Sequence, residues 1–266
     1  MEKRIECSNP QNPSGLDVSS ITEVVSITID KSNALDPIAK VEVSNVKQDG
    51  RRRPDNPINQ YFLKSGELLN KLVLSLSSDG RIQRVVNRDE VLQNWEYIKI
   101  YLDNYFVSDD ENVLSTIKEW TNQIGISVKN ESQFLQIVRS DSFYNFYFYG
   151  YWLNYSRNNQ LTIQKSHPAI FGSAKTVFNE TLQISGDDGF NKVKIVGVLD
   201  KDASDMIGIA SFLGIGEKQT KDLTVELNGT CVFDALGLVD KMDICVDVNL
   251  DNLGLHRSYI LKVNND

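Results

Sequence analysis

The spacing of apolar and polar residues divides the chain into three stretches, and the first of them predicts β-strands. β-Branched or alternating apolar residues form short runs that end at turn-forming residues. Asp79-Gly80 separates the last two runs, and this dipeptide is a strong signal for a tight hairpin. The expected strands of this stretch cover residues 17–30, 37–46, 59–66, 68–77 and 81–87.

Residues 87–156 change to the helical period and form the expected helical insert. The first helix opens at Asn87, three residues before Glu90, as in a capping box. Its apolar stripe falls at helical spacing on Val91, Trp95, Ile98 and Leu102. A second helix is expected over residues 108–125, with Gly125 as its stop.

A short third helix over residues 130–138 precedes a block of aromatic residues, FYNFYFYGYWLNY, at 143–155. We place this block on a fourth helix that begins at Ser140 or Asp141. Rings on nearly every side of a helix require burial on nearly every side, so the block is interpreted as core and not as a ligand platform. A strand with rings on both faces is the alternative. Tyr151 and Trp152 are kept as candidate contacts to a ligand or partner.

From about residue 160 the pattern returns to β, apart from a looser stretch at 200–221 that predicts a short helix over 205–212 or a mobile flap. Strands, then helices, then strands, without regular β-α-β alternation, predict an α+β chain. We expect a mainly antiparallel curved β-sheet, built from N- and C-terminal strands and wrapping the central helical insert, within a single domain of residues 1–266. The expected C-terminal strands cover residues 161–166, 174–185, 190–199, 221–235, 242–251 and 256–263.

Charge and composition restrict the classes of partner. The formal net charge of −8 disfavours nucleic-acid binding, which needs a basic excess. The exception is the basic run Arg51, Arg52 and Arg53 in a turn-rich loop, where a solvated charge run is favoured over a binding patch, and these residues are kept as candidate partner contacts. No apolar stretch follows the basic residues at the start, and no segment is long and apolar enough for a membrane helix.

The odd number of widely spaced cysteines, Cys7, Cys231 and Cys245, is typical of reduced thiols rather than a disulfide framework. Together with the absence of a recognisable export signal, it predicts a cytoplasmic protein with no membrane partner. Secretion by a route that needs no signal is left open.

Catalytic and metal-binding motifs are mostly missing. The two histidines, His167 and His256, lack the short ligand spacing of a zinc site, and no Gly-x-Ser-x-Gly nucleophile elbow is present. A triad through either histidine is left open. No motif predicts a cofactor. The acidic residues Asp200, Asp202 and Asp205 match a calcium loop only in part, and they are the candidate cation ligands.

One segment resembles a known group of proteins. Its pattern is a strand, an Asp-Gly turn, a second strand, then Asn-x-x-Glu-Val and a tryptophan that opens a helix, and it is formed here by Asp79, Gly80, Ile82, Asn87, Glu90, Val91 and Trp95. The segment at about residues 69–102 is similar to an uncharacterised group of intracellular β-rich proteins, some of them associated with contractile injection (type VI-like) secretion systems. The resemblance implies an adaptor, chaperone or immunity role, and it implies no catalytic residue.

Three hypotheses follow for function. The first is a non-enzymatic module that binds another protein, since catalytic motifs are lacking and the loops at 51–53 and 200–221 are long enough to make contacts. The second is a hydrolase with a carboxylate-based site, lined by Tyr151, Trp152 and the acidic residues of 200–205. The third is a carrier that holds an apolar ligand between the sheet and the helices.

Overall fold

The structure is a computed structural model, and it divides the chain into two compact units that we describe separately. The sheet unit comprises Met1–Val24, Asn45–Arg51 and Ser140–Asp266, and the helical unit comprises Val25–Ser44 and Arg52–Arg139. The structure describes residues 2–8, 19–32, 36–49, 57–105, 111–148, 159–167, 170–171, 174–187, 190–234, 239–250 and 255–264.

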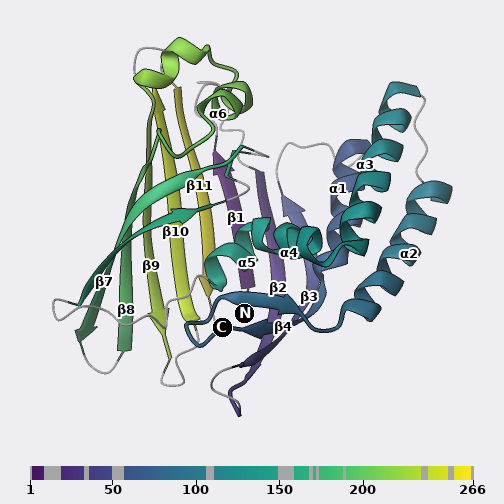
Figure 1. Cartoon of the computed structure of the whole chain (residues 1–266), viewed down its shortest axis with the longest axis horizontal. Coiled ribbons are helices and arrows are strands. Elements are labelled where there is room, and N and C mark those ends of the chain that lie inside the picture. Colours follow the sequence, from purple (N-terminus) through teal and green to yellow (C-terminus); the bar gives the residue numbers. More distant parts are fainter. Residues whose placement is uncertain are drawn as a thin grey trace. The chain divides into compact units, whose positions relative to one another are not determined.

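The strands of the sheet unit follow the order β2-β1-β11-β10-β9-β8-β7-β6, and all neighbouring pairs are antiparallel (Figure 1). Most are joined in sequence order, which is the connection that suits antiparallel strands. Their bounds are β1 (Glu2–Ser8), β2 (Ser19–Asp30), β6 (Gln160–Ser166), β7 (Val177–Asp187), β8 (Phe190–Leu199), β9 (Thr224–Phe233), β10 (Val239–Leu250) and β11 (Leu255–Asn264). The C-terminal strands predicted from the sequence are therefore confirmed.

Alternation along the strands creates the core of the sheet unit. Buried positions alternate with exposed or half-buried ones along β8, β9 and β10, as expected for a sheet with one covered face. Gly229 in β9 interrupts the row because its neighbours fill the space. It lies opposite Ile195 on one side and Ile244 on the other, and a Cβ at residue 229 would overlap Ile244 Cδ1. The glycine thus makes room for the isoleucine side chains of the adjacent strands.

The sheet unit also contains the helices α5 (Ser142–Tyr147) and α6 (Met206–Leu213). Asp141 caps α5 by accepting the backbone N–H groups of Phe143 and Tyr144 at 2.8 and 3.1 Å, which confirms the predicted start of the aromatic helix. The helix ends at Tyr147. The four aromatic rings of the helix and that of the next residue are all buried: Phe143, Tyr144, Phe146, Tyr147 and Phe148.

The helical unit contains strands in the order β5-β4-β3-β2, with β3 (Ile38–Asp49), β4 (Lys71–Leu76) and β5 (Ile82–Val85) paired antiparallel. Both β2 and β3 contribute residues to both units. The helices of this unit are α1 (Pro57–Gly66), the short 3-10 helix η1 (Glu67–Leu69), α2 (Arg88–Tyr105), α3 (Glu111–Lys129) and α4 (Glu131–Ser140), and Figure 1 shows α2 and α3 lying side by side.

The apolar stripe of α2 is confirmed, since Val91, Trp95, Ile98 and Leu102 are all buried. Its predicted capping box takes a different form. Asn87 accepts the backbone N–H of Val73 in β4 at 2.8 Å, and its amide donates to Glu90 at 3.1 Å. The start of α2 is therefore attached to the neighbouring strand.

Two expectations in the helical unit are wrong. Residues 59–66 form part of α1 and not a strand, because Pro57 suits a first helical turn and Tyr61 packs 5.6 Å from the Trp120 ring of α3. Gly125 does not stop a helix but lies inside α3. A Cβ there would come within 3.1 Å of Trp95 Nε1, so the glycine permits close contact between α3 and the indole of α2.

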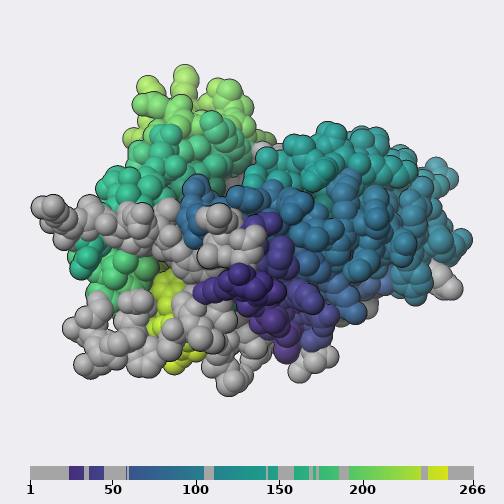
Figure 2. Space-filling model, turned by 60° about the horizontal axis from the view of Figure 1, so that its bottom comes forward, coloured from purple at the N-terminus to yellow at the C-terminus, as the bar shows by residue number. Residues whose placement is uncertain are grey.

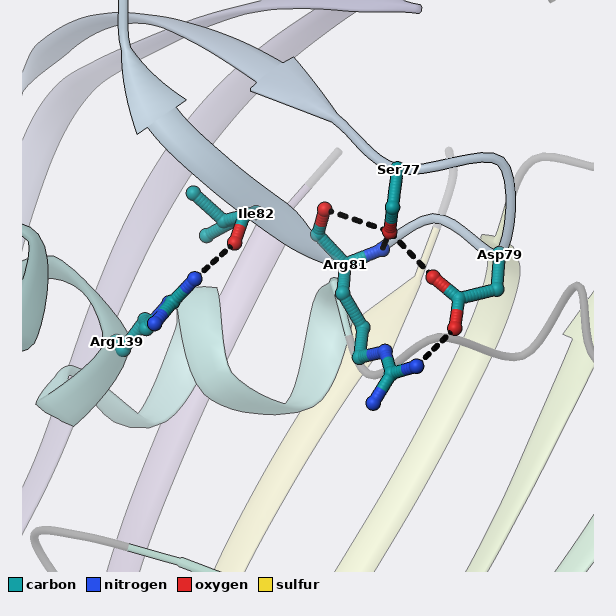
Figure 3. A network of polar contacts seen from close by, with 5 residues as sticks. All are labelled: Ser77, Asp79, Arg81, Ile82 and Arg139. Atoms are coloured by element: carbon teal, nitrogen blue, oxygen red, sulfur yellow. Dashed lines mark hydrogen bonds and ion pairs between the residues drawn. The ribbon is translucent and has the colours of Figure 1, made fainter. Parts of the chain in front are cut away.

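The predicted hairpin between β4 and β5 is confirmed at Ser77–Gly80, and Gly80 adopts the positive φ of 87° that favours glycine. Figure 3 shows its polar contacts: Ser77 Oγ accepts the backbone N–H of Arg81 at 3.1 Å, and Asp79 accepts from both Ser77 and the Arg81 guanidinium. Arg139 at the end of α4 donates to the carbonyl of Ile82 at 2.6 Å and so holds α4 against β5.

The chain therefore belongs to the α+β class with antiparallel sheet, as predicted. Among the helices that the structure describes, none combines the length and the apolar character needed to cross a membrane.

Candidate functional site

The most unusual polar group of the sheet unit is a buried cluster of His167, Glu180 and Asn145. Three elements bring these residues together: His167 follows β6, Glu180 lies in β7, and Asn145 lies in α5. The antiparallel pairing of β6 with β7 extends past Ser166, because the backbone N–H of His167 donates to the Thr176 carbonyl at 2.9 Å. The backbone of His167 is thereby fixed opposite Thr176, directly before the start of β7.

Both ring nitrogens of His167 are used in this cluster. Nδ1 lies 2.7 Å from Asn145 Oδ1, and Nε2 makes a short contact with Glu180 Oε1. Because an amide oxygen only accepts, Nδ1 carries a proton and donates it. With a neutral imidazole, Nε2 is then an acceptor, and the proton between it and Glu180 belongs to the carboxylic acid.

Apolar groups enclose the cluster. The Phe146 ring stacks on the imidazole at 4.8 Å, and Phe178 meets it edge-on at 5.7 Å. Gly197 in β8 pairs with Glu180, and a Cβ on it would lie 3.0 Å from Glu180 Cγ. The missing side chain at residue 197 therefore leaves space for the buried carboxyl group.

Burial explains the protonation state of both groups. It raises the pKa of Glu180 to about 8 and, together with the positive charge of Lys165, lowers the pKa of His167 well below its usual value. Glu180 Oε2 is buried and has no hydrogen-bond partner among the residues that the structure describes, which disfavours the ionised form. At neutral pH the pair is uncharged overall.

The cluster holds α5 against the sheet and cannot act on a substrate directly. Both His167 and Glu180 are 0% exposed, so no solute reaches their reactive atoms without opening of the fold. Sequence reasoning missed this cluster because its members are separated by 13 and 22 positions. One signal was available: Glu180 occupies an inward position of its strand, between the buried Phe178 and Leu182.

The candidate cation ligands have hydrogen-bonding roles in the loop after β8. Asp200 accepts hydrogen bonds from the backbone N–H groups of Asp202 and Ala203 at 3.1 and 3.0 Å. These hydrogen bonds, above all the one from Ala203, lower the pKa of the Asp200 carboxyl group. Asp205 caps α6 by accepting the N–H of Gly208 at 3.0 Å. Within the described residues no group of three or more His, Cys, Asp or Glu side chains is placed to hold a metal ion.

The remaining candidate contacts cannot be placed. Arg51, Arg52, Arg53, Tyr151 and Trp152 lie outside the described residues.

The helical unit carries a second feature that the sequence did not single out, an exposed apolar surface on α1 and α2. We call it the α1–α2 surface and define it by Phe62, Leu63, Tyr97, Ile100 and Tyr101. Tyr97 and Ile100 are 67% and 58% exposed. Helical spacing places Tyr97, Ile100 and Tyr101 on one side of α2, opposite its buried stripe.

Lys64 joins the two halves of this surface. Its ammonium group lies 4.6 Å from the Tyr101 ring centre and 5.8 Å from that of Tyr97, and it pairs with Glu67 at 2.6 Å. On α1 the Phe62 ring leans on Trp120 of α3 at 5.4 Å. The rings are thus held in place before any partner is present. In Figure 2 the region coloured as α2 and α3 lies at the surface of the molecule.

Comparisons with known proteins add little. No protein-family model matches the chain, and no curated protein matches it. A solved structure described as lipid-protein interactions in lipovitellin aligns with a TM-score of 0.43 and 9% identity, over 100% of this chain and 24% of that chain. The chain thus spans about a quarter of that protein, and the likeness is too low to support a conclusion on fold or function.

Proposed function

We propose that this chain is a non-enzymatic protein-binding module and that the α1–α2 surface makes the contact. The observation that carries the proposal is the exposure of five large apolar side chains on two adjacent helices. Exposed apolar groups gathered in this way mark interaction surfaces, and aromatic residues are enriched at the centres of such interfaces.

The order of the rings also supports binding. A partner that covers Tyr97 and Ile100 removes apolar area from water, which favours association. Because Lys64 and Trp120 already restrain Tyr101 and Phe62, less side-chain entropy is lost when the partner binds. The partner contributes apolar side chains of its own, as a helix or a sheet face would.

The adaptor, chaperone or immunity role implied by the resemblance at residues 69–102 is part of the same proposal. All three roles require a stable protein contact and no catalytic group. The segment that carries the resemblance includes most of α2, residues 88–102, and with it Tyr97, Ile100 and Tyr101 of the α1–α2 surface.

Site-specific photo-crosslinking tests this proposal in cells that express the protein naturally. A photoreactive phenylalanine analogue replaces Tyr97 in one variant and Val198, an exposed residue of β8, in the control. We expect a crosslinked protein adduct from position 97 and none from position 198. The double change Tyr97→Ser and Ile100→Ser should then reduce co-purification of that protein about tenfold or more.

The control variant is Val198→Ser, which alters an exposed apolar residue of the sheet unit. It should co-purify the same protein as the wild type does. Equal adducts from positions 97 and 198, or co-purification unchanged by the double substitution, would contradict the proposal.

A further inference from the structure

A pocket of about 250 Å³ opens between α2 and α3 in the helical unit. Its lining alternates between the two helices: Trp95, Glu96 and Lys99 from α2, and Thr121, Asn122, Gly125, Ile126 and Lys129 from α3. None of these residues belongs to the α1–α2 surface. The pocket is therefore a separate feature, with its own chemistry.

Its floor is apolar and flat. Trp95 contributes the indole ring, which is almost completely buried under the pocket, and Gly125 keeps the wall of α3 open beside it. A Cβ on residue 125 would lie 3.1 Å from the indole Nε1, so any larger residue would press on the ring. Ile126 is 65% exposed and adds an apolar side. A planar apolar group fits this lining.

The polar side chains of the pocket are mostly charged, and only some of them have a partner: the Thr121 hydroxyl donates to the Ile117 carbonyl at 2.8 Å. The side chains of Lys99 and Lys129 form neither a hydrogen bond nor an ion pair with any residue that the structure describes, and the same holds for the side chains of Glu96 and Asn122. In a protein of net charge −8, two unpaired ammonium groups at one pocket are a local basic site. Each can hold an anionic group as a point charge, and Asn122 can donate a hydrogen bond to it.

We propose that this pocket binds a small aromatic carboxylate, with its ring against Trp95 and Gly125 and its carboxylate between Lys99 and Lys129. The site does not rest on the protein-binding proposal, because no residue is shared. The negative charge of Glu96 repels the bound anion. Removing that charge therefore strengthens binding, whereas removing either lysine charge weakens it, and a purely apolar pocket would show neither effect.

The test uses phenylacetate as the probe and the whole chain labelled with ¹⁵N at tryptophan. The indole N–H signals are assigned by the loss of one signal in Trp120→Phe and of another in Trp152→Phe. Titration should shift the Trp95 signal with a Kd on the order of 1 mM, as expected for a ligand of this size. Phenylacetamide, which has the ring without the charge, and acetate, which has the charge without the ring, should both bind more weakly.

Charge variants complete the test. We expect Lys99→Met and Lys129→Met each to weaken phenylacetate binding about fivefold, and Glu96→Gln to strengthen it. Lys118→Met, an exposed lysine of α3 outside the pocket, is the matched control and should leave binding unchanged. The proposal is overturned if phenylacetate leaves the Trp95 signal unmoved, if phenylacetamide binds equally well, or if the pocket lysine variants behave like Lys118→Met.

Discussion

Glu180 and His167 share one dissociable proton in the folded protein, and the unfolded chain distributes its protons differently. Unfolded Glu180 titrates near 4.5 and unfolded His167 near 6.5. Between pH 4.5 and 6.5 the folded pair binds one proton in total, and so do the two unfolded side chains together. In this range the pair therefore adds no pH dependence to the free energy of unfolding. Above 6.5 the unfolded side chains bind none, while the folded pair keeps its proton up to the Glu180 pKa of about 8.

The sign of the pH dependence follows directly. Where the folded state binds more protons, the free energy of unfolding falls as pH rises. We expect the contribution of the pair to the free energy of unfolding to stay constant from about pH 4.5 to 6.5. It should then fall by on the order of 2 kcal/mol up to pH 8, at no more than about 1.4 kcal/mol per pH unit. Urea unfolding at a series of pH values measures this curve.

Glu180→Gln is the informative variant, because its amide can donate to Nε2 without titrating. Its stability should rise up to about pH 6.5 through His167 and then stay level, so that the stability of the variant increases relative to that of the wild type from about pH 4.5 to pH 8. Glu226→Gln, at an exposed position of β9, is the control and should follow the wild-type curve. Parallel curves for wild type and Glu180→Gln would show that the carboxyl group is not protonated in the folded state.

At the scale of the element, α6 in the loop after β8 is capped at both ends. Asp205 accepts from Gly208 at the start of the helix, and Gly214 ends it at a positive φ of 69°. We expect Asp205→Ala to lower the free energy of unfolding by about 1 kcal/mol, and Asp205→Asn to change it by a few tenths, because asparagine caps equally well.

Asp202→Ala provides the matched control, since the Asp202 side chain is exposed and makes no capping bond in the described loop. Thermal unfolding of the three variants compares them. A loss with Asp205→Asn as large as that with Asp205→Ala would indicate that the charge, and not the cap, is needed.

Elements with a local signal were predictable from the sequence, whereas those decided by distant contacts were not. The α2 stripe repeats every three or four residues, so the face containing Trp95 could be identified without knowing its neighbours. Residues 59–66 carry an apolar run that is equally compatible with a strand, and the packing of Tyr61 on Trp120 decides for a helix. Glycine commonly ends a helix, but Gly125 lies inside α3, where the close approach of the Trp95 indole requires a residue without a side chain.

The candidate site shows the same limit. Asp205 was selected as a cation ligand for its charge, but it caps α6, because it is the residue that directly precedes this helix. The exposed rings of the α1–α2 surface have no distinctive pattern in sequence. Their exposure follows from which face of α2 is occupied by its buried stripe, and from the unpredicted helix α1.

At the scale of the whole molecule, each unit has its own core, while β2 and β3 contribute to both. This arrangement predicts local destabilisation by core substitutions. We expect Trp95→Ala and Phe146→Ala each to cost about 3–5 kcal/mol, because both side chains are buried. Hydrogen exchange followed by mass spectrometry should show faster exchange in α2–α4 for the first variant and in β6–β8 for the second.

The two substitutions act as controls for one another, since each probes one unit. The sequence predicted a single domain, and a uniform rise in exchange across the chain for both variants would agree with that prediction. Separate responses would show that the two units open independently.

The buried carboxylic acid of Glu180 also makes folding a reaction that consumes acid. Slightly above pH 7 the unfolded side chains of Glu180 and His167 are mostly deprotonated, whereas folded Glu180 is mostly protonated, so each molecule that folds withdraws more than half a proton on average from its buffer. The heat measured on folding therefore includes the heat of ionising the buffer, and it differs between phosphate and Tris even though the protein reaches the same structure.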